Sequence, residues 1–174
     1  VSCGGRYLRV LALSDDCLTV VVGQSDNVTN CVHILRLRAD MRAVEADGAY
    51  MLPRGMSGPM SGVCVPGGRW ALAACRQGAV AVDLGTGATR TLARWPDGQN
   101  RAVFASAVSA CGTMAAFGRG NNTIVVMGGL DAALGGADAD THTIGCGGWV
   151  HSVSFSACGE HIAVGARGGR VVVH

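Results

Sequence analysis

Three arginines at matching positions are the residues of this sequence best suited to binding chemistry. Arg76, Arg119 and Arg167 each follow a turn glycine by 7–8 residues, and a further glycine comes closely after each of them. A guanidinium group offers a fork of donors that binds carboxylates and phosphates in a bidentate manner. Three such groups on one surface would suit an acidic peptide, a carboxylate or a phosphate. The alternative is that each arginine caps carbonyls or is solvated at its own turn; the first such position holds Gln24.

Metal binding is a second kind of chemistry to consider, because imidazoles and thiols gather in the last quarter of the chain. Their spacing matches no zinc-site pattern, so we expect no metal and interpret them as unrelated core and surface residues. They are His142, Cys146, His151, Cys158 and His161. The eight cysteines of the chain form no Cys-x-x-Cys pair, and several lie in apolar runs. Buried, reduced thiols are therefore expected.

Catalytic residues are poorly represented. The 14 basic residues are all arginines, which excludes a lysine-containing phosphate loop, a Schiff-base lysine and a pyridoxal-phosphate site. No Gly-x-Ser-x-Gly nucleophile motif occurs. Glu45 and Glu160 are the two glutamates, and most aspartates stand in turn sequences. We therefore expect a protein without catalytic activity and without a cofactor.

The composition further limits the class of protein. The chain has 174 residues, 49% hydrophobic and 15% charged, which is typical of a folded chain. Its net charge of +2 is too small to predict nucleic-acid binding. No apolar run approaches the roughly 18 residues that a membrane span needs, and no signal-peptide pattern precedes the first strand, so we expect a cytoplasmic protein. A start at Val1 is typical of a fragment or a processed chain.

The elements that would position the arginines are short strands arranged in a repeat. Apolar runs of four to seven residues alternate with glycine turns, and residues 102–112 and 150–159 share the turn Ser-Ala-Cys-Gly. Four copies follow one another at 44–52-residue spacing, each with three strong strands. Weaker fourth strands are expected at residues 43–46, 88–93 and 141–144. The four units are bounded approximately as 1–50, 51–98, 99–144 and 145–174.

One four-stranded sheet in every 40–50 residues predicts an all-β propeller with four-stranded antiparallel blades. A twisted sheet cannot cover both of its own faces, so neighbouring blades bury each other, and inner strands become near-continuous apolar runs. The last unit ends after its third strand. We therefore expect about four blades, the last one incomplete, within a larger propeller or one completed by other residues.

The order of strand, Ser-x-x-Gly turn, strand, tight turn and Val-rich strand resembles the WD-repeat family. The similarity is strongest at residues 149–159, Trp-Val-His-Ser-Val-Ser-Phe-Ser-Ala-Cys-Gly. The Trp-Asp dipeptide of that family is absent, and the nearest equivalent is Val82-Asp83-Leu84. Within the family, residues 146–159 are similar to a segment of the propeller subunits of the actin-related protein 2/3 complex. That similarity implies a structural role in actin filament nucleation.

The resemblance and the arginine pattern together predict a non-catalytic scaffold for protein–protein interactions within a multi-subunit complex. Its partners would be other proteins, among them actin-related proteins or an acidic peptide. The predicted partner-binding residues are Arg76, Arg119 and Arg167, with Trp149 and His151 near an adjoining turn. Two alternatives stay open: a propeller domain of a trafficking, ciliary or ribosome-assembly complex, and an enzyme with its site at the mouth of the propeller axis.

Overall fold

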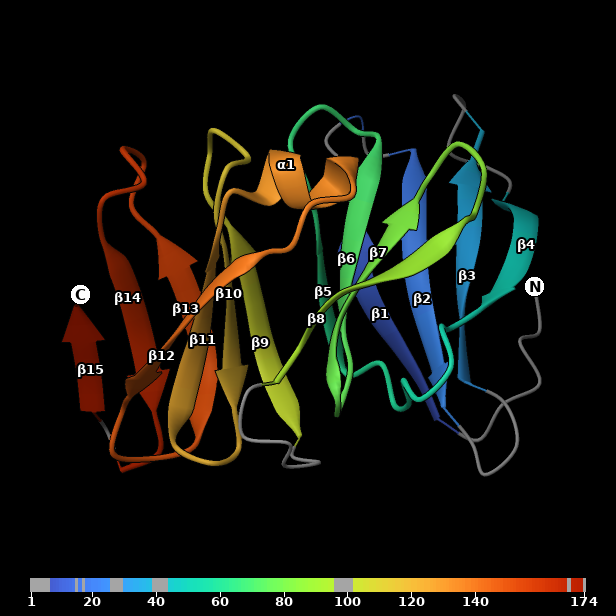
Figure 1. Cartoon of the computed structure of the whole chain (residues 1–174). Helices are drawn as coiled ribbons and strands as arrows, with labels where there is room; N and C mark the ends of the chain where they lie inside the picture. Colours follow the sequence, from blue (N-terminus) through green and yellow to red (C-terminus); the bar gives the residue numbers. More distant parts are fainter. Residues whose placement is uncertain are drawn as a thin grey trace.

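The computed structural model describes residues 7–14, 16, 18–25, 30–38, 44–95, 102–168 and 170–173. Within these residues the strands form four antiparallel sheets, each with its strands in chain order (Figure 1). The first sheet contains β1 (Tyr7–Leu13), β2 (Thr19–Ser25), β3 (Asn30–Leu37) and β4 (Val44–Met51). The second contains β5 (Ser61–Cys64), β6 (Trp70–Ala74), β7 (Gly78–Asp83) and β8 (Thr89–Arg94).

The other two sheets repeat this arrangement. The third contains β9 (Val103–Val108), β10 (Ala115–Arg119), β11 (Thr123–Gly128) and β12 (Asp140–Gly145), with helix α1 (Leu130–Gly135) between β11 and β12. The fourth contains β13 (Val150–Phe155), β14 (Ile162–Ala166) and β15 (Arg170–Val173). The prediction of antiparallel propeller blades is confirmed, and the expected weak fourth strands form β4, β8 and β12. In the described residues the last blade has three strands.

Neighbouring blades contact each other through their first strands. β1 packs beside β5, β5 beside β9, and β9 beside β13, so these four strands are the innermost ones of the propeller. A hydroxyl pair links two of them directly, because Ser61 Oγ lies 2.8 Å from Ser106 Oγ. The second and third strands carry most of the core: all six residues of β7 and all five of β10 are buried. No helix among the described residues is long and apolar enough to cross a membrane.

Contact between blades depends on small residues. Gly118 on β10 faces β13 of the next blade so closely that an added Cβ would lie 2.4 Å from Cγ1 of Val150 and 3.2 Å from Cγ2 of Val153. Sheets approach this tightly only where a side chain is missing. The sequence pattern of Gly and Ala in the inner strands therefore reflects the packing of one sheet on the next.

The fourth sheet differs from the others in its burial. β14 alternates between buried and more exposed residues, and Ala163 is exposed, whereas β6 and β10 are buried along almost their whole length. On β13, Ser152 and Ser154 are exposed as well. The second strand of the blade is therefore covered on both faces in blades two and three, where it is β6 and β10. In blade four, where it is β14, it is covered on one face.

Alternating strand directions place the connections at two opposite faces of the propeller. The turns between second and third strands and the loops that lead to the next blade lie at one face, which is the lower edge in Figure 1. We call this the arginine face and define it by residues 52–60, 75–77, 119–122, 146–149 and 166–168. The turns between first and second strands lie at the opposite face, together with α1.

The tight contact at Gly118 leads to a stability prediction. Gly118→Ala places a methyl group against Val150, so we expect the free energy of unfolding to fall by about 1–3 kcal/mol. Gly128→Ala is the matched control, because an added Cβ at Gly128 meets nothing within 4 Å. Chemical denaturation of both variants measures the difference. Equal stability of the two variants would show that the packing between blades is looser than described here.

Candidate functional site

Three of the five predicted partner-binding residues meet in one exposed cluster. Phe104, from β9, stacks on Trp149 with ring centroids 6.1 Å apart and planes inclined by 28°, and on His151 at 5.3 Å and 27°. The guanidinium carbon of Arg167 lies 5.1 Å from the centre of the Trp149 ring. We call Phe104, Trp149, His151 and Arg167 the aromatic cluster. It joins the innermost strands of blades three and four at the arginine face.

The backbone holds this cluster in place. The amide of Arg167 donates to the carbonyl of Trp149 at 2.7 Å, which ties the β14–β15 turn to the segment before β13. Gly148 permits this approach, since a Cβ there would lie 2.5 Å from the carbonyl oxygen of Arg167. The Trp149 side chain nevertheless stays 44% exposed. A large aromatic surface is thus both fixed in position and open to a partner.

Arg76 is the fourth predicted residue on this face. Its side chain is exposed, and its stem crosses Gly58, whose added Cβ would lie 3.1 Å from Nε of Arg76. The neighbouring Gln77 and Ser57 form a reciprocal pair: the Ser57 amide donates to Oε1 of Gln77 at 2.8 Å, and Nε2 of Gln77 donates to the Ser57 hydroxyl at 2.7 Å. These hydrogen bonds therefore attach the loop at Ser57 and Gly58 firmly to the turn that carries Arg76.

Arg119 occupies the same register but has a different environment. It is 1% exposed, and its guanidinium carbon lies 5.4 Å from the centre of the Trp95 ring. Trp95 in turn donates from Nε1 to the carbonyl of Cys75 at 3.0 Å, so this group links blade three to blade two. Gln24, at the first such position, is also buried, with Oε1 2.6 Å from Nε2 of His33. The recurring arginines therefore do not form a continuous exposed ring.

Charge is distributed unevenly between the two faces. In the described part of the arginine face, Arg54, Arg76 and Arg167 are exposed, and no aspartate or glutamate is present. The described turns of the opposite face carry most of the exposed carboxylates. They contain Asp16, Asp131, Asp138 and Glu160, beside the cations Arg38 and Arg69. An acidic protein segment would therefore be attracted more strongly to the arginine face than to the opposite face as a whole.

The thiols follow the sequence expectation only in part. Cys31, Cys64, Cys75 and Cys146 are buried and reduced, whereas Cys111 and Cys158 are exposed. The remaining two, Cys3 and Cys17, lie outside the described residues. Both exposed thiols stand in the Ser-Ala-Cys-Gly turn that connects the first two strands of a blade, so the expectation of buried thiols was wrong for these two.

Hydrogen bonds make Cys111 more acidic than an ordinary thiol. The hydroxyl of Ser109, 3.4 Å from Sγ, and that of Thr113, 3.0 Å away, stabilise the thiolate and lower the pKa of Cys111 to about 7. The Ser156 hydroxyl lowers the pKa of Cys158 in the same way from 3.1 Å. Burial has the opposite effect on Cys75 and raises its pKa to about 12.

Comparison with solved structures identifies the fold. The chain matches Kuenenia stuttgartiensis hydrazine synthase with a TM-score of 0.75 and 14% identity, over 98% of this chain and 58% of that chain. It matches the C-terminal WD40 domain of Sif2 with a TM-score of 0.72 and 13% identity, over 99% of this chain and 46% of that chain. The chain has a WD40-type β-propeller fold.

The WD40-type propeller described here spans about half the length of these two solved chains. No protein-family model and no curated protein sequence matches it. The low identities show a shared fold alone. The site residues therefore have to be judged on their own geometry, and Phe104 is the one that the sequence analysis missed. Its signal was weak, since a single Phe in an inner strand is normally a core residue.

The shifted thiols give a test of the turn geometry. We expect alkylation of Cys111 by iodoacetamide to rise with pH and reach half its maximal rate near pH 7, because the thiolate is the reacting form. Thr113→Val removes one donor, raises the pKa and slows the reaction at pH 7 by about two- to fivefold. Thr113→Ser is the matched control and keeps the donor. A half-maximal rate above pH 8 in the native protein would contradict the described hydrogen bonds.

Proposed function

We propose that this propeller is a non-catalytic scaffold that binds an acidic segment of a partner protein on its arginine face. The observation that carries the proposal is the aromatic cluster, a stacked and exposed group beside cationic side chains. Trp and Arg are the residues most enriched at energetically dominant interface positions. Here Trp149 and Arg167 stand together on a face whose described loops contain no carboxylate.

The geometry suggests how such a segment would be held. An apolar side chain of the partner packs on the exposed part of Trp149. The ring of Phe104 stacks on the indole and holds it in place. Carboxylates of the partner accept hydrogen bonds from Arg167 and from Arg76. Since the loop at Ser57 and the turn at Arg167 are already fixed by hydrogen bonds, little conformational entropy is lost on binding.

Catalysis on this face is disfavoured by the same composition. General acid–base and two-carboxylate mechanisms need carboxylates placed near the substrate, and the described loops of the arginine face carry none. The similarity to a hydrazine synthase chain concerns the fold and transfers no chemistry at 14% identity. A scaffold therefore accounts for the surface better than an enzyme does.

The finer role that we consider is structural participation in actin filament nucleation. Its support is the similarity of residues 146–159 to a segment of the actin-complex propeller subunits, and this segment contains Trp149 and His151 of the aromatic cluster. A trafficking, ciliary or ribosome-assembly complex is the alternative. In each case we propose that the exposed face of the fourth sheet packs against a further blade, as the equivalent faces of blades two and three do.

The first test compares partners of the native protein with those of single variants on the two faces. We expect Arg167→Ala and Arg76→Ala each to lower recovery of bound proteins about tenfold, since a hydrogen bond between charged groups contributes about 1.5–3 kcal/mol. Arg38→Ala removes the same charge on the opposite face, where Arg38 is 62% exposed, and should leave recovery unchanged. Quantitative mass spectrometry after pull-down from the source cell measures all three.

The identities of the captured proteins decide the finer role. Actin-related proteins that are lost in Arg167→Ala and kept in Arg38→Ala would support participation in nucleation, and a different set would support another complex. If all variants recover the same proteins in the same amounts, the arginine face is not the binding surface. Arg119 is left unchanged in this design, because its burial against Trp95 makes its substitution a test of folding.

A second test addresses the aromatic part of the surface. Trp149→Ala should weaken partner binding by about 2 kcal/mol or more, as is usual for an aromatic interface residue of this kind. Met51→Ala is a matched control, because Met51 is 61% exposed and apolar but lies at the end of β4, away from the aromatic cluster. Isothermal titration with a captured partner compares the two. Equal affinity of both variants would remove Trp149 from the interface.

A further inference from the structure

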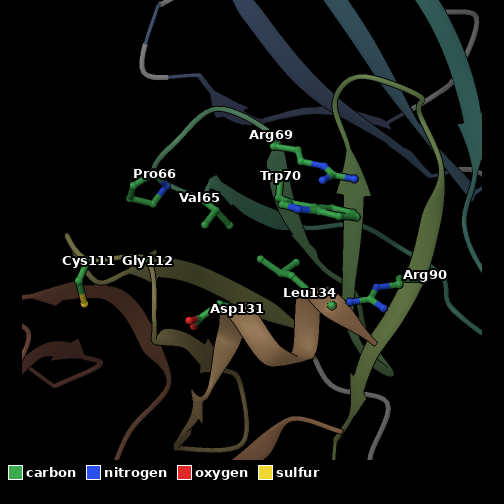
Figure 2. Close-up of a pocket in the computed structure, with 10 residues that line it drawn as sticks. Val65, Pro66, Arg69, Trp70, Arg90, Cys111, Gly112, Asp131 and Leu134 are labelled. Carbon is green, nitrogen blue, oxygen red and sulfur yellow. The ribbon is translucent and has the colours of Figure 1, made fainter. Parts of the chain in front are cut away.

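A second site lies on the face opposite the arginine face, between blades two and three. The turn before β6, the outer strand β8, the β9–β10 turn and helix α1 line a cavity of about 630 Å³ that is open to solvent (Figure 2). Small-molecule sites in proteins have volumes of roughly 300–1,000 Å³. This cavity has that size, and none of the five residues predicted for partner binding lines it.

One wall of the cavity is cationic and aromatic. The guanidinium carbons of Arg69 and Arg90 lie 5.1 Å and 5.8 Å from the centre of the Trp70 ring, and Figure 2 shows them on either side of the indole. Arg69 uses Nε and Nη2 to bind Asp83 at 3.3 Å and 3.2 Å. Arg90 donates from Nη2 to the carbonyl of Ala133 in α1.

After these contacts are made, N–H donors of both arginines remain available to a ligand. In the described structure Nη1 of Arg69 and Nη1 of Arg90 have no hydrogen-bond partner, and Nε of Arg90 is buried without one. A guanidinium with a free N–H group is well suited to a carboxylate, which accepts hydrogen bonds from its planar set of donors. The anionic end of a ligand is thus expected at this wall.

The remaining walls define the rest of the ligand. Val65 and Leu134 line the cavity beside the indole of Trp70 and provide an apolar surface. Asp131 of α1 stands on another part of the wall, is exposed and disfavours a second negative charge there. Gly135 contributes no side chain, and an added Cβ would meet nothing within 4 Å, so the space is open at this point.

We propose that this cavity binds a small monocarboxylate with an apolar or aromatic body. The carboxylate accepts hydrogen bonds from Arg69 and Arg90, and the body lies against Trp70, Val65 and Leu134. Asp131 selects against dicarboxylates. The site is independent of the scaffold function proposed above, because it lies on the opposite face and uses none of its residues.

Cys111 serves as a built-in reporter, since it lines the cavity and its thiol is exposed. Cys158 occupies the same Ser-Ala-Cys-Gly turn in the next blade and does not line this cavity, so it is an internal control. The probe is 4-phenylbutyrate, and the rate of iodoacetamide alkylation at each thiol is measured by peptide mass spectrometry. At about 10 mM probe we expect alkylation at Cys111 to slow about threefold or more, and at Cys158 to stay unchanged.

Comparison compounds test each part of the proposal. Benzyl alcohol lacks the carboxylate, 3-phenylglutarate adds a second one, and phenyl phosphate replaces it with a phosphate; each should protect Cys111 less than 4-phenylbutyrate does. Arg69→Gln should reduce the protection about fivefold or more, whereas Arg38→Gln, on the same face but outside the cavity, should not. Stronger protection by phenyl phosphate would overturn the carboxylate assignment.

A cavity-filling variant separates binding from non-specific effects. Gly135→Trp occupies the open space beside Leu134 and should abolish protection, while Gly145→Trp adds the same side chain at the end of β12, where a Cβ also meets nothing within 4 Å. Each variant is compared with its own alkylation rate without probe, and Gly135→Leu replaces Gly135→Trp if the latter does not fold. Protection that persists in the filled variant, or that is equal at Cys111 and Cys158, overturns the proposal.

Discussion

The structure depends on the close packing of one twisted sheet against the next. A four-stranded sheet leaves two faces to cover, and here each blade covers one face of its neighbour. Gly118 shows how close this contact is, because no side chain fits between β10 and Val150 of the following blade. The same packing brings β1, β5, β9 and β13 together at the centre, and both candidate sites lie at the junctions that it creates.

The two sites lie at neighbouring junctions between blades, one at the arginine face and the other at the opposite face. At the junction of blades three and four, Phe104 and His151 come from adjacent innermost strands, and their stacking supports Trp149 at the arginine face. At the junction of blades two and three, the turn before β6 and helix α1 stand apart and leave the cavity at the other face. Rigid sheets thus position residues that are far apart in the sequence, and both the strands and their connections supply binding groups.

The repeat pattern was sufficient to predict the fold, because strand period, turn glycines and copy length are local properties of the sequence. It also placed Arg119 and Arg167 at equivalent positions, yet one is buried and the other exposed. The difference arises from neighbours: Trp95 of the preceding blade covers Arg119, whereas Arg167 lies on Trp149, which remains exposed. No short stretch of the sequence indicates such a contact between blades. The cavity was missed for the same reason, since Arg69, Arg90 and Leu134 converge only after two blades have packed.

We propose that an exposed aromatic and cationic surface on one face of the propeller binds the partner protein. Hydrogen exchange of the propeller alone and in complex with a captured partner tests this most directly, because it locates the interface without any substitution. We expect amides of residues 146–152 and 166–168 to become protected in the complex, and those of residues 109–113 on the opposite face to stay unchanged. Protection confined to the opposite face, with none around Trp149, would contradict it.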